Sequence, residues 1–157
     1  MTVTRRRYLA AVSGVAGVAL AGCGGGDVNR TTYDADTAEA PSEVSDYVSD
    51  SSNFDGSMVD LTGRDEVEVM VGVSGNNNYY AFGPPAIKVS TGTKVVWNWT
   101  GRGRNHNVVS KGSGPLSSSP SSQKGHTYNH TFQNSGIYLY YCTPHEVYGM
   151  KGAVVVE

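Results

Sequence analysis

Three side chains with sulfur or nitrogen donors lie close together in the stretch YYCTPHEVYGM. Cys142, His145 and Met150 follow the spacing Cys-x2-His-x4-Met. The stretch falls between two predicted strands, so a thiolate, an imidazole and a thioether can converge from one loop. Soft sulfur donors with imidazole suit copper, and a trigonal Cys/His/His set with a weak axial Met accommodates both Cu(I) and Cu(II). The pattern predicts one copper ion, for which a second histidine is needed.

His106 is the predicted second imidazole. It lies 36 residues before Cys142, at the start of a candidate strand, so a sandwich of sheets could bring it to the same end as the Cys142 loop. His126 and His130 are the rival imidazoles. Both fall within a strand pattern, and we expect them to pack or hydrogen bond near the core and not to bind copper.

Other kinds of site compete for the same residues. Structural zinc prefers four Cys and His ligands, usually in two close pairs, and methionine is a poor zinc ligand. A Cys-His nucleophile needs a third group to orient the histidine and a substrate site beside it. Disulfide exchange is disfavoured because the chain has no Cys-x-x-Cys pair. A copper site is the interpretation that uses the thiolate, the imidazoles and the thioether together.

Alternation of apolar and polar residues predicts the elements that position these donors. A period of two indicates half-buried strands over 67–73, 95–99, 128–132 and 137–141. Shorter candidates cover 86–89, 106–110 and 152–156, separated by loops rich in Gly, Pro, Ser and Asn. Seven or eight short strands predict an all-β fold, either a β-sandwich or a small Greek-key barrel.

The N-terminal residues are predicted to direct export and not to join the fold. An arginine cluster and a short apolar stretch over 1–22 resemble a twin-arginine signal peptide. The sequence LAGC ends at Cys23 like a lipobox, which predicts lipid on that cysteine and attachment to the outer face of a prokaryotic cell membrane. Because the chain has only two cysteines, a lipidated Cys23 would leave Cys142 without a disulfide partner.

Composition divides the remainder into a tether and a domain. Residues 23–46 are polar and acidic, which predicts a flexible tether, and the folded domain is placed at 47–157. Twelve acidic residues lie between Asp27 and Glu68. From Val69 onward the chain has seven basic residues and only two acidic ones. The net charge of -2 and the lack of a basic run with aromatics argue against nucleic acid binding.

Several stretches within 47–157 resemble those of one known family. They are FDG at 54–56, DLTG at 60–63, the segment 93–99 with its Trp-x-Trp-Thr ending, HNVV at 106–109, and 140–156. In them the chain resembles the cupredoxins, and among these the halocyanins, small membrane-attached blue copper proteins of haloarchaea related to plastocyanin. The resemblance implies a Greek-key β-sandwich, a type 1 copper site and one-electron transfer.

Residue by residue, the resemblance makes His106, Cys142 and His145 the equatorial copper ligands and Met150 the axial ligand. It gives Asn107 a backbone amide that points at the thiolate and stabilises its charge. It also implies that electrons pass through the edge of His145, which lies near the surface.

The function predicted from these features is a one-electron carrier and not an enzyme. Its partners would be membrane-bound respiratory donor and acceptor proteins, and the carrier itself would be a monomer. A cell-surface protein that captures or delivers copper is the competing class. Such a protein usually exposes open Met-rich or Cys/His sites, whereas this loop offers one compact set.

Overall fold

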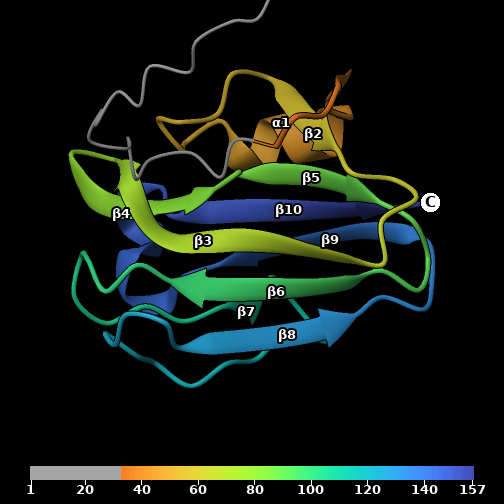
Figure 1. The fold of residues 1–157 in the computed structure, drawn as a ribbon. Helices are drawn as coiled ribbons and strands as arrows, with labels where there is room; N and C mark the ends of the chain where they lie inside the picture. Colours follow the sequence, from red (N-terminus) through yellow and green to blue (C-terminus); the bar gives the residue numbers. More distant parts are fainter. Residues whose placement is uncertain (1–32) are drawn as a thin grey trace, which may run out of the picture.

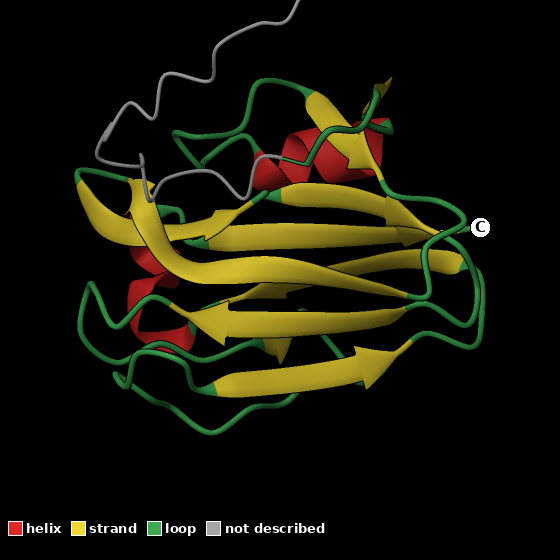
Figure 2. Ribbon diagram, in the orientation of Figure 1, coloured by secondary structure: helices red, strands yellow, loops and turns green. Residues whose placement is uncertain are grey.

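The computed structural model describes residues 33–157. The predicted signal peptide and the predicted lipidation site at Cys23 lie outside these residues. Figure 1 shows two β-sheets packed face to face, and Figure 2 shows how little helix accompanies them. The elements in chain order are β1 (Thr37–Glu39), α1 (Ser42–Val48), β2 (Ser57–Asp60), β3 (Glu66–Gly75), β4 (Asn78–Gly83), β5 (Ala86–Val89), β6 (Lys94–Trp99), β7 (Val109–Ser110), β8 (Thr127–Thr131), β9 (Gly136–Tyr141), the 3-10 helix η1 (Thr143–Tyr148) and β10 (Lys151–Val156).

The strands form a six-stranded and a four-stranded sheet. Their orders are β1-β2-β5-β10-β9-β7 and β4-β3-β6-β8. Strand β10 runs parallel to β5 and antiparallel to β9, so a strand late in the sequence lies near the middle of its sheet. The all-β sandwich is therefore confirmed. All seven predicted strands are present, and β1, β2 and β4 are additional.

The main core fills the space between the two sheets. Trp97, Trp99 and Tyr140 are its largest buried side chains, and Cys142 and Met150 belong to the same cluster. Both tryptophans come from β6, in which alternate residues point inward, as the period of two predicts. The two sulfur donors of the predicted metal site are thus part of the core, where close packing restricts their movement.

A second, smaller cluster lies on the outer face of the six-stranded sheet. Helix α1 covers this face with Val44 and Val48, which pack in one cluster with Ala153 and Val155 of β10. Strand β10 thereby buries both of its faces, which explains why its sequence reads as a continuous apolar run.

The predicted boundary between tether and domain at 46/47 is wrong. It falls inside α1, and β1 pairs with β2 through the register Ala38 to Met58. The error has a physical cause: only two of the seven residues of α1 are buried, so its sequence keeps the polar composition of a linker. The domain includes at least residues 33–46. Within residues 33–157, no helix is long and apolar enough to cross a membrane.

Candidate metal centre

His106, Cys142 and His145 converge at one end of the sandwich. His106 lies in the connection between β6 and β7, Cys142 directly follows β9, and His145 lies in η1. The Cys142 Sγ is 3.7 Å from His106 Nδ1 and 3.5 Å from His145 Nδ1. The two Nδ1 atoms are 3.0 Å apart. All three residues are buried, and they are a group that could hold a metal ion.

The size of this triangle fits a first-row transition metal. The circle through the three donor atoms has a radius of about 2.0 Å, close to the roughly 2.0 to 2.3 Å bonds that such a metal forms with imidazole and thiolate. One thiolate and two imidazoles are also the equatorial donors of blue copper sites. Both the spacing and the chemistry of the donor set therefore suit copper.

The ring of His106 is oriented by its neighbours. Its Nε2 lies 2.7 Å from the carbonyl oxygen of Arg102 and donates its proton there, which leaves Nδ1 free as a ligand. The indole N–H of Trp99 donates to the backbone carbonyl of His106 at 3.1 Å. Trp99 belongs to the core cluster. It also holds the backbone of a predicted ligand.

Two glycines make room for that ring. A Cβ on Gly72 would lie 2.6 Å from the Arg102 carbonyl and 3.1 Å from His106 Nε2. A Cβ on Gly103 would lie 2.7 Å from the same nitrogen and would collide with the carbonyl of Tyr79. Gly72 sits at a register shift in the pairing of β3 with β4. The imidazole is thus packed against bare backbone.

The backbone amides of Asn107 and His145 lie near the thiol of Cys142 and act to lower its pKa. The side chain of Asn107 joins the two ligand-bearing segments, because its Oδ1 accepts the N–H of Thr143 at 2.7 Å and its Nδ2 donates to Thr143 Oγ1 at 3.1 Å. Asn107 therefore holds the segment after His106 against the segment after Cys142, and its amide lies where it would stabilise a thiolate.

Burial sets the protonation of the metal-free site. It raises the pKa of Cys142 to about 11, although the backbone amides of Asn107 and His145 act in the opposite direction. It lowers the pKa of His106 to about 4, although the bond to Arg102 acts in the opposite direction. The pKa of His145 is also lowered, by burial first and then by the charge of Arg104. At neutral pH the thiol is protonated and both imidazoles are neutral, so a metal that binds as a thiolate complex displaces one proton.

Met150 is fully buried in the same core cluster as Cys142. Its carbonyl accepts the N–H of Cys142 at 3.0 Å, and its N–H donates to the carbonyl of His145 at 3.1 Å. These two bonds close the loop from 142 to 150 on itself. The backbone of Met150, the predicted axial ligand, is thereby fixed beside Cys142 and His145.

An aromatic stack leads from His145 to the surface. The ring of Tyr80 lies parallel to the imidazole of His145, with centroids 3.9 Å apart and an interplanar angle of 15°. Tyr80 also stacks on Tyr148, which is 58% exposed, and Val147 beside it is 87% exposed. Within the described part of the chain, these two are the exposed large apolar side chains.

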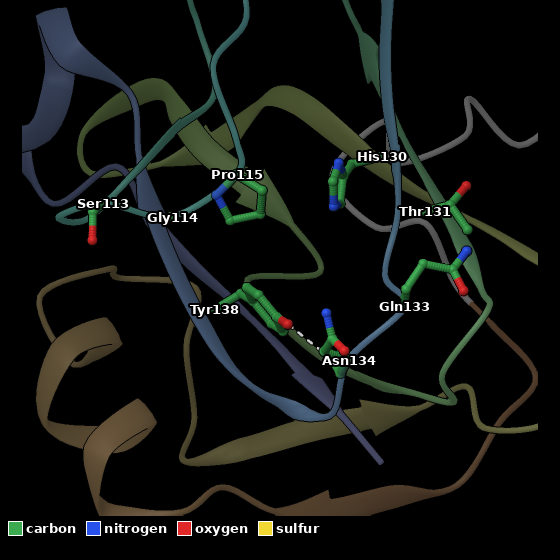
Figure 3. Close-up of a pocket in the computed structure, with 8 residues that line it drawn as sticks. All are labelled: Ser113, Gly114, Pro115, His130, Thr131, Gln133, Asn134 and Tyr138. Atoms are coloured by element: carbon green, nitrogen blue, oxygen red, sulfur yellow. Dashed lines mark hydrogen bonds between the residues drawn. The ribbon is translucent and has the colours of Figure 1, made fainter.

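His126 and His130 lie elsewhere. His126 contacts the ring of Trp99, and His130 contacts that of Phe132. His130 also lines a surface pocket of about 430 Å³ (Figure 3). Tyr138 lies opposite His130 in that pocket, and its hydroxyl donates to the carbonyl of Asn134 at 2.8 Å. The residues that line the pocket include none of the four predicted copper ligands.

We predict that His126→Ala and His130→Ala each leave copper binding and its visible spectrum unchanged, since neither imidazole belongs to the cluster of donors. His106→Ala should abolish the same spectrum. Absorption spectroscopy after loading with one equivalent of copper would check both. Loss of the spectrum in either control, with its retention in His106→Ala, would overturn the assignment.

The sequence did not predict the residues that support the metal centre through backbone packing or through ring stacking. Gly72 interrupts an alternating valine strand, which is a signal for a bulge or a close approach of backbone. Tyr80 has no such signal, because its contact with His145 depends on how two distant segments pack.

Comparison with known proteins shows similarity to copper-binding proteins. Residues 67–157 match the family described as copper binding proteins, plastocyanin/azurin family. Halocyanin from Natronomonas pharaonis is 41% identical over 162 residues, covering 99% of this chain and 98% of that protein. Plastocyanin from Sambucus nigra is 34% identical over 58% of this chain and all of its own length. The solved structure of oxidised plastocyanin from Dryopteris crassirhizoma is 25% identical, covers 58% of this chain and all of its own, and has a TM-score of 0.47.

Three observations lead to one conclusion. The chain is similar to a halocyanin over nearly its full length, and its match to the copper-binding family includes the three clustered donors. The triangle of donor atoms also has the size that a metal ion needs. The chain belongs to the halocyanins, within the plastocyanin/azurin family of copper-binding proteins.

Proposed function

We propose that this blue copper electron carrier works at the outer face of the cell membrane, held there by lipid on Cys23, and exchanges one electron at a time with membrane-bound respiratory partners. The lipobox ending at Cys23 supports the anchor. His106, Cys142 and His145 would be the equatorial ligands and Met150 the axial one. The protein would act as a monomer and would turn over no substrate.

The observation that carries the proposal is the closed, buried donor triangle beside an exposed aromatic surface. Copper held by one thiolate and two imidazoles can accept and return one electron with little change in geometry. The residues around it contribute rigidity. Arg102 and Asn107 fix the two segments that carry ligands, and the core cluster packs beneath them.

Electrons would enter and leave beside His145. Tyr80 and Tyr148 extend from this ring to the surface, where Val147 is also exposed. A small apolar patch suits brief docking, because carriers need rapid release and use small interfaces. Capture or delivery of copper is less well supported, since a buried site surrounded by core residues exchanges metal slowly.

The test is to load the full chain with Cu(II) and follow its visible and EPR spectra during a reductive titration. The proposal predicts an intense blue band that is lost on addition of one electron equivalent per chain and recovered on reoxidation. Copper should stay bound in both states in the presence of a chelator. Rapid loss of Cu(I) to the chelator would instead indicate copper trafficking.

Arg102 and Arg104 are both exposed and lie close to His106 in the sequence, where they would steer acidic partners. We predict that the double variant Arg102→Glu/Arg104→Glu reacts roughly tenfold more slowly with the anionic oxidant hexacyanoferrate(III) at low salt, because the local attraction becomes repulsion. Stopped-flow mixing with the reduced protein measures this rate.

Screening should remove most of that difference as ionic strength rises above about 0.15 M. Lys94→Glu is a control for the position of the charge change, because Lys94 begins β6, whose other end leads to the site. It lowers the net charge by two, and the double variant lowers it by four, so its effect on the rate should be far less than half as large. A rate that is the same in parent and double variant at every ionic strength would contradict steering by these arginines.

A further inference from the structure

Residues 49–54, the first part of the connection between α1 and β2, lie against the loop that carries Cys142, His145 and Met150. The carbonyl of Asp50 covers the α-carbon of Gly149, where a Cβ would collide with it. Gly149 has a φ of 94° and ends η1 immediately before Met150. The carboxylate of Asp50 also forms an ion pair with Lys151.

The side chain of Asn76 links the same connection to β4. Its Oδ1 accepts the N–H of Ser52 at 2.8 Å, and its Nδ2 donates to the carbonyl of Tyr80 at 2.7 Å. Its own backbone N–H donates to Ser52 Oγ at 2.6 Å. The Oδ1 also borders the α-carbon of Gly149, where a Cβ would lie 3.2 Å away. Asn76 is buried, so these bonds are shielded from water.

This asparagine therefore touches three parts of the protein at once. One is the connection 49–54, one is the backbone of Tyr80, whose ring stacks on His145, and one is the ligand loop at Gly149. Displacing Asn76 would loosen the stack on His145 and the support under Gly149 together.

The hairpin turn between β3 and β4 explains only in part why residue 76 is an asparagine. Asn76 and Asn77 form a two-residue hairpin turn between the paired residues Gly75 and Asn78, with φ values of 57° and 65°. Asparagine is favoured at both positions of such a turn because it tolerates positive φ. Asn77 is exposed, however, whereas the side chain of Asn76 is buried and hydrogen bonded.

The supporting connection lies outside the part of the chain that matches the plastocyanin/azurin family, although the similarity to halocyanin extends over it. That match begins at residue 67, after both α1 and residues 49–54. Helix α1 and residues 49–54 are therefore additions to the plastocyanin-like part of the chain.

We propose that Asn76, Ser52 and Asp50 are positioning residues of the copper centre, which hold the loop 142–150 in its ligand-binding shape before metal arrives. These residues support the backbone of the loop and do not touch the metal. With this support the loop needs little rearrangement to bind copper, and bound copper leaves slowly. The inference rests on the proposed role of this loop in binding copper.

Asn76→Gly in the full chain tests the proposal, because glycine keeps the positive φ and removes only the side chain. Asn77→Gly is the matched control at the adjacent turn position. In the metal-free protein, hydrogen exchange at the amides of Cys142 and Met150 should be roughly tenfold faster in Asn76→Gly, given the net strength of the hydrogen bonds lost. Asn77→Gly should exchange like the parent.

The reduced, copper-loaded protein provides a second measurement. Copper transfer to the Cu(I) chelator bathocuproine disulfonate should accelerate by a similar factor in Asn76→Gly and should not change in Asn77→Gly.

Asp50→Asn, which removes the charge that pairs with Lys151, should also accelerate copper transfer. Glu66→Gln breaks the ion pair with Lys94 at the start of β6 and serves as its control.

Parental exchange at Cys142 and Met150 in Asn76→Gly, with only a lower melting temperature, would overturn the proposal and leave Asn76 as a hairpin residue. Faster copper loss without faster exchange in the metal-free protein would also overturn it, because the loop would then not be preformed. The exchange measurement needs no copper. It decides this proposal even if the protein proves not to carry electrons.

Discussion

Cys142→Ser should abolish the intense visible band of the copper-loaded protein. That band requires a thiolate bound to copper, and a serine hydroxyl at the same position is a hard, neutral donor. We expect copper affinity to fall by more than the roughly 10- to 100-fold typical of losing a residue that only orients a ligand. Visible absorption and a competition titration against a chelator would measure the two effects.

Met150→Leu is the informative contrast. A weak axial ligand tunes a blue copper site more than it builds it, so this variant should keep the blue colour and show a raised reduction potential. If Cys142→Ser kept the band, the thiolate would not be the ligand. Colour lost in Met150→Leu with copper still bound would mean that the thioether contributes more than an axial contact.

Gly103→Ala should disrupt the site without changing any donor. At a φ of 79°, alanine costs about 1–2 kcal/mol in backbone strain alone. The new methyl group would also meet His106 Nε2 at 2.7 Å and collide with the Tyr79 carbonyl. The ring must then leave the Arg102 carbonyl, and copper affinity should fall roughly 10- to 100-fold.

Gly112→Ala separates strain from displacement of the ring. Gly112 has a φ of 74° but open space where its Cβ would lie. It should lower the melting temperature through backbone strain and leave the copper spectrum and affinity unchanged. A parental spectrum and affinity in Gly103→Ala would show that His106 is not held by its packing against this glycine.

The candidate donors could be predicted from sequence because the information that points to them is local. Cys142, His145 and Met150 lie within nine residues, and a short loop between strands leaves them few arrangements. His106 needed one more assumption, that a sandwich folds it back to the same end. The cluster of His106, Cys142 and His145 agrees with that assumption.

The supports of the site could not be predicted in this way. Tyr80, Gly72 and Gly103 contribute through contacts between segments that are far apart in sequence, and their spacing carries no periodic signal. Residues 42–46 of helix α1 are predicted as tether because the helix buries only Val44 and Val48, so its composition is that of a solvated linker. Tertiary packing, and not local propensity, makes this segment part of the domain.

The position of β10 between β5 and β9 has a consequence for how the protein comes to hold copper. Until residues 151–156 have been synthesised, β1-β2-β5 and β9-β7 have no strand to join them into one sheet. Every predicted ligand has been translated by residue 150, yet the strand that completes the sheet comes later. On the ribosome, copper would therefore meet a chain whose donors are present but not yet assembled, and the centre should form only after the last strand has emerged.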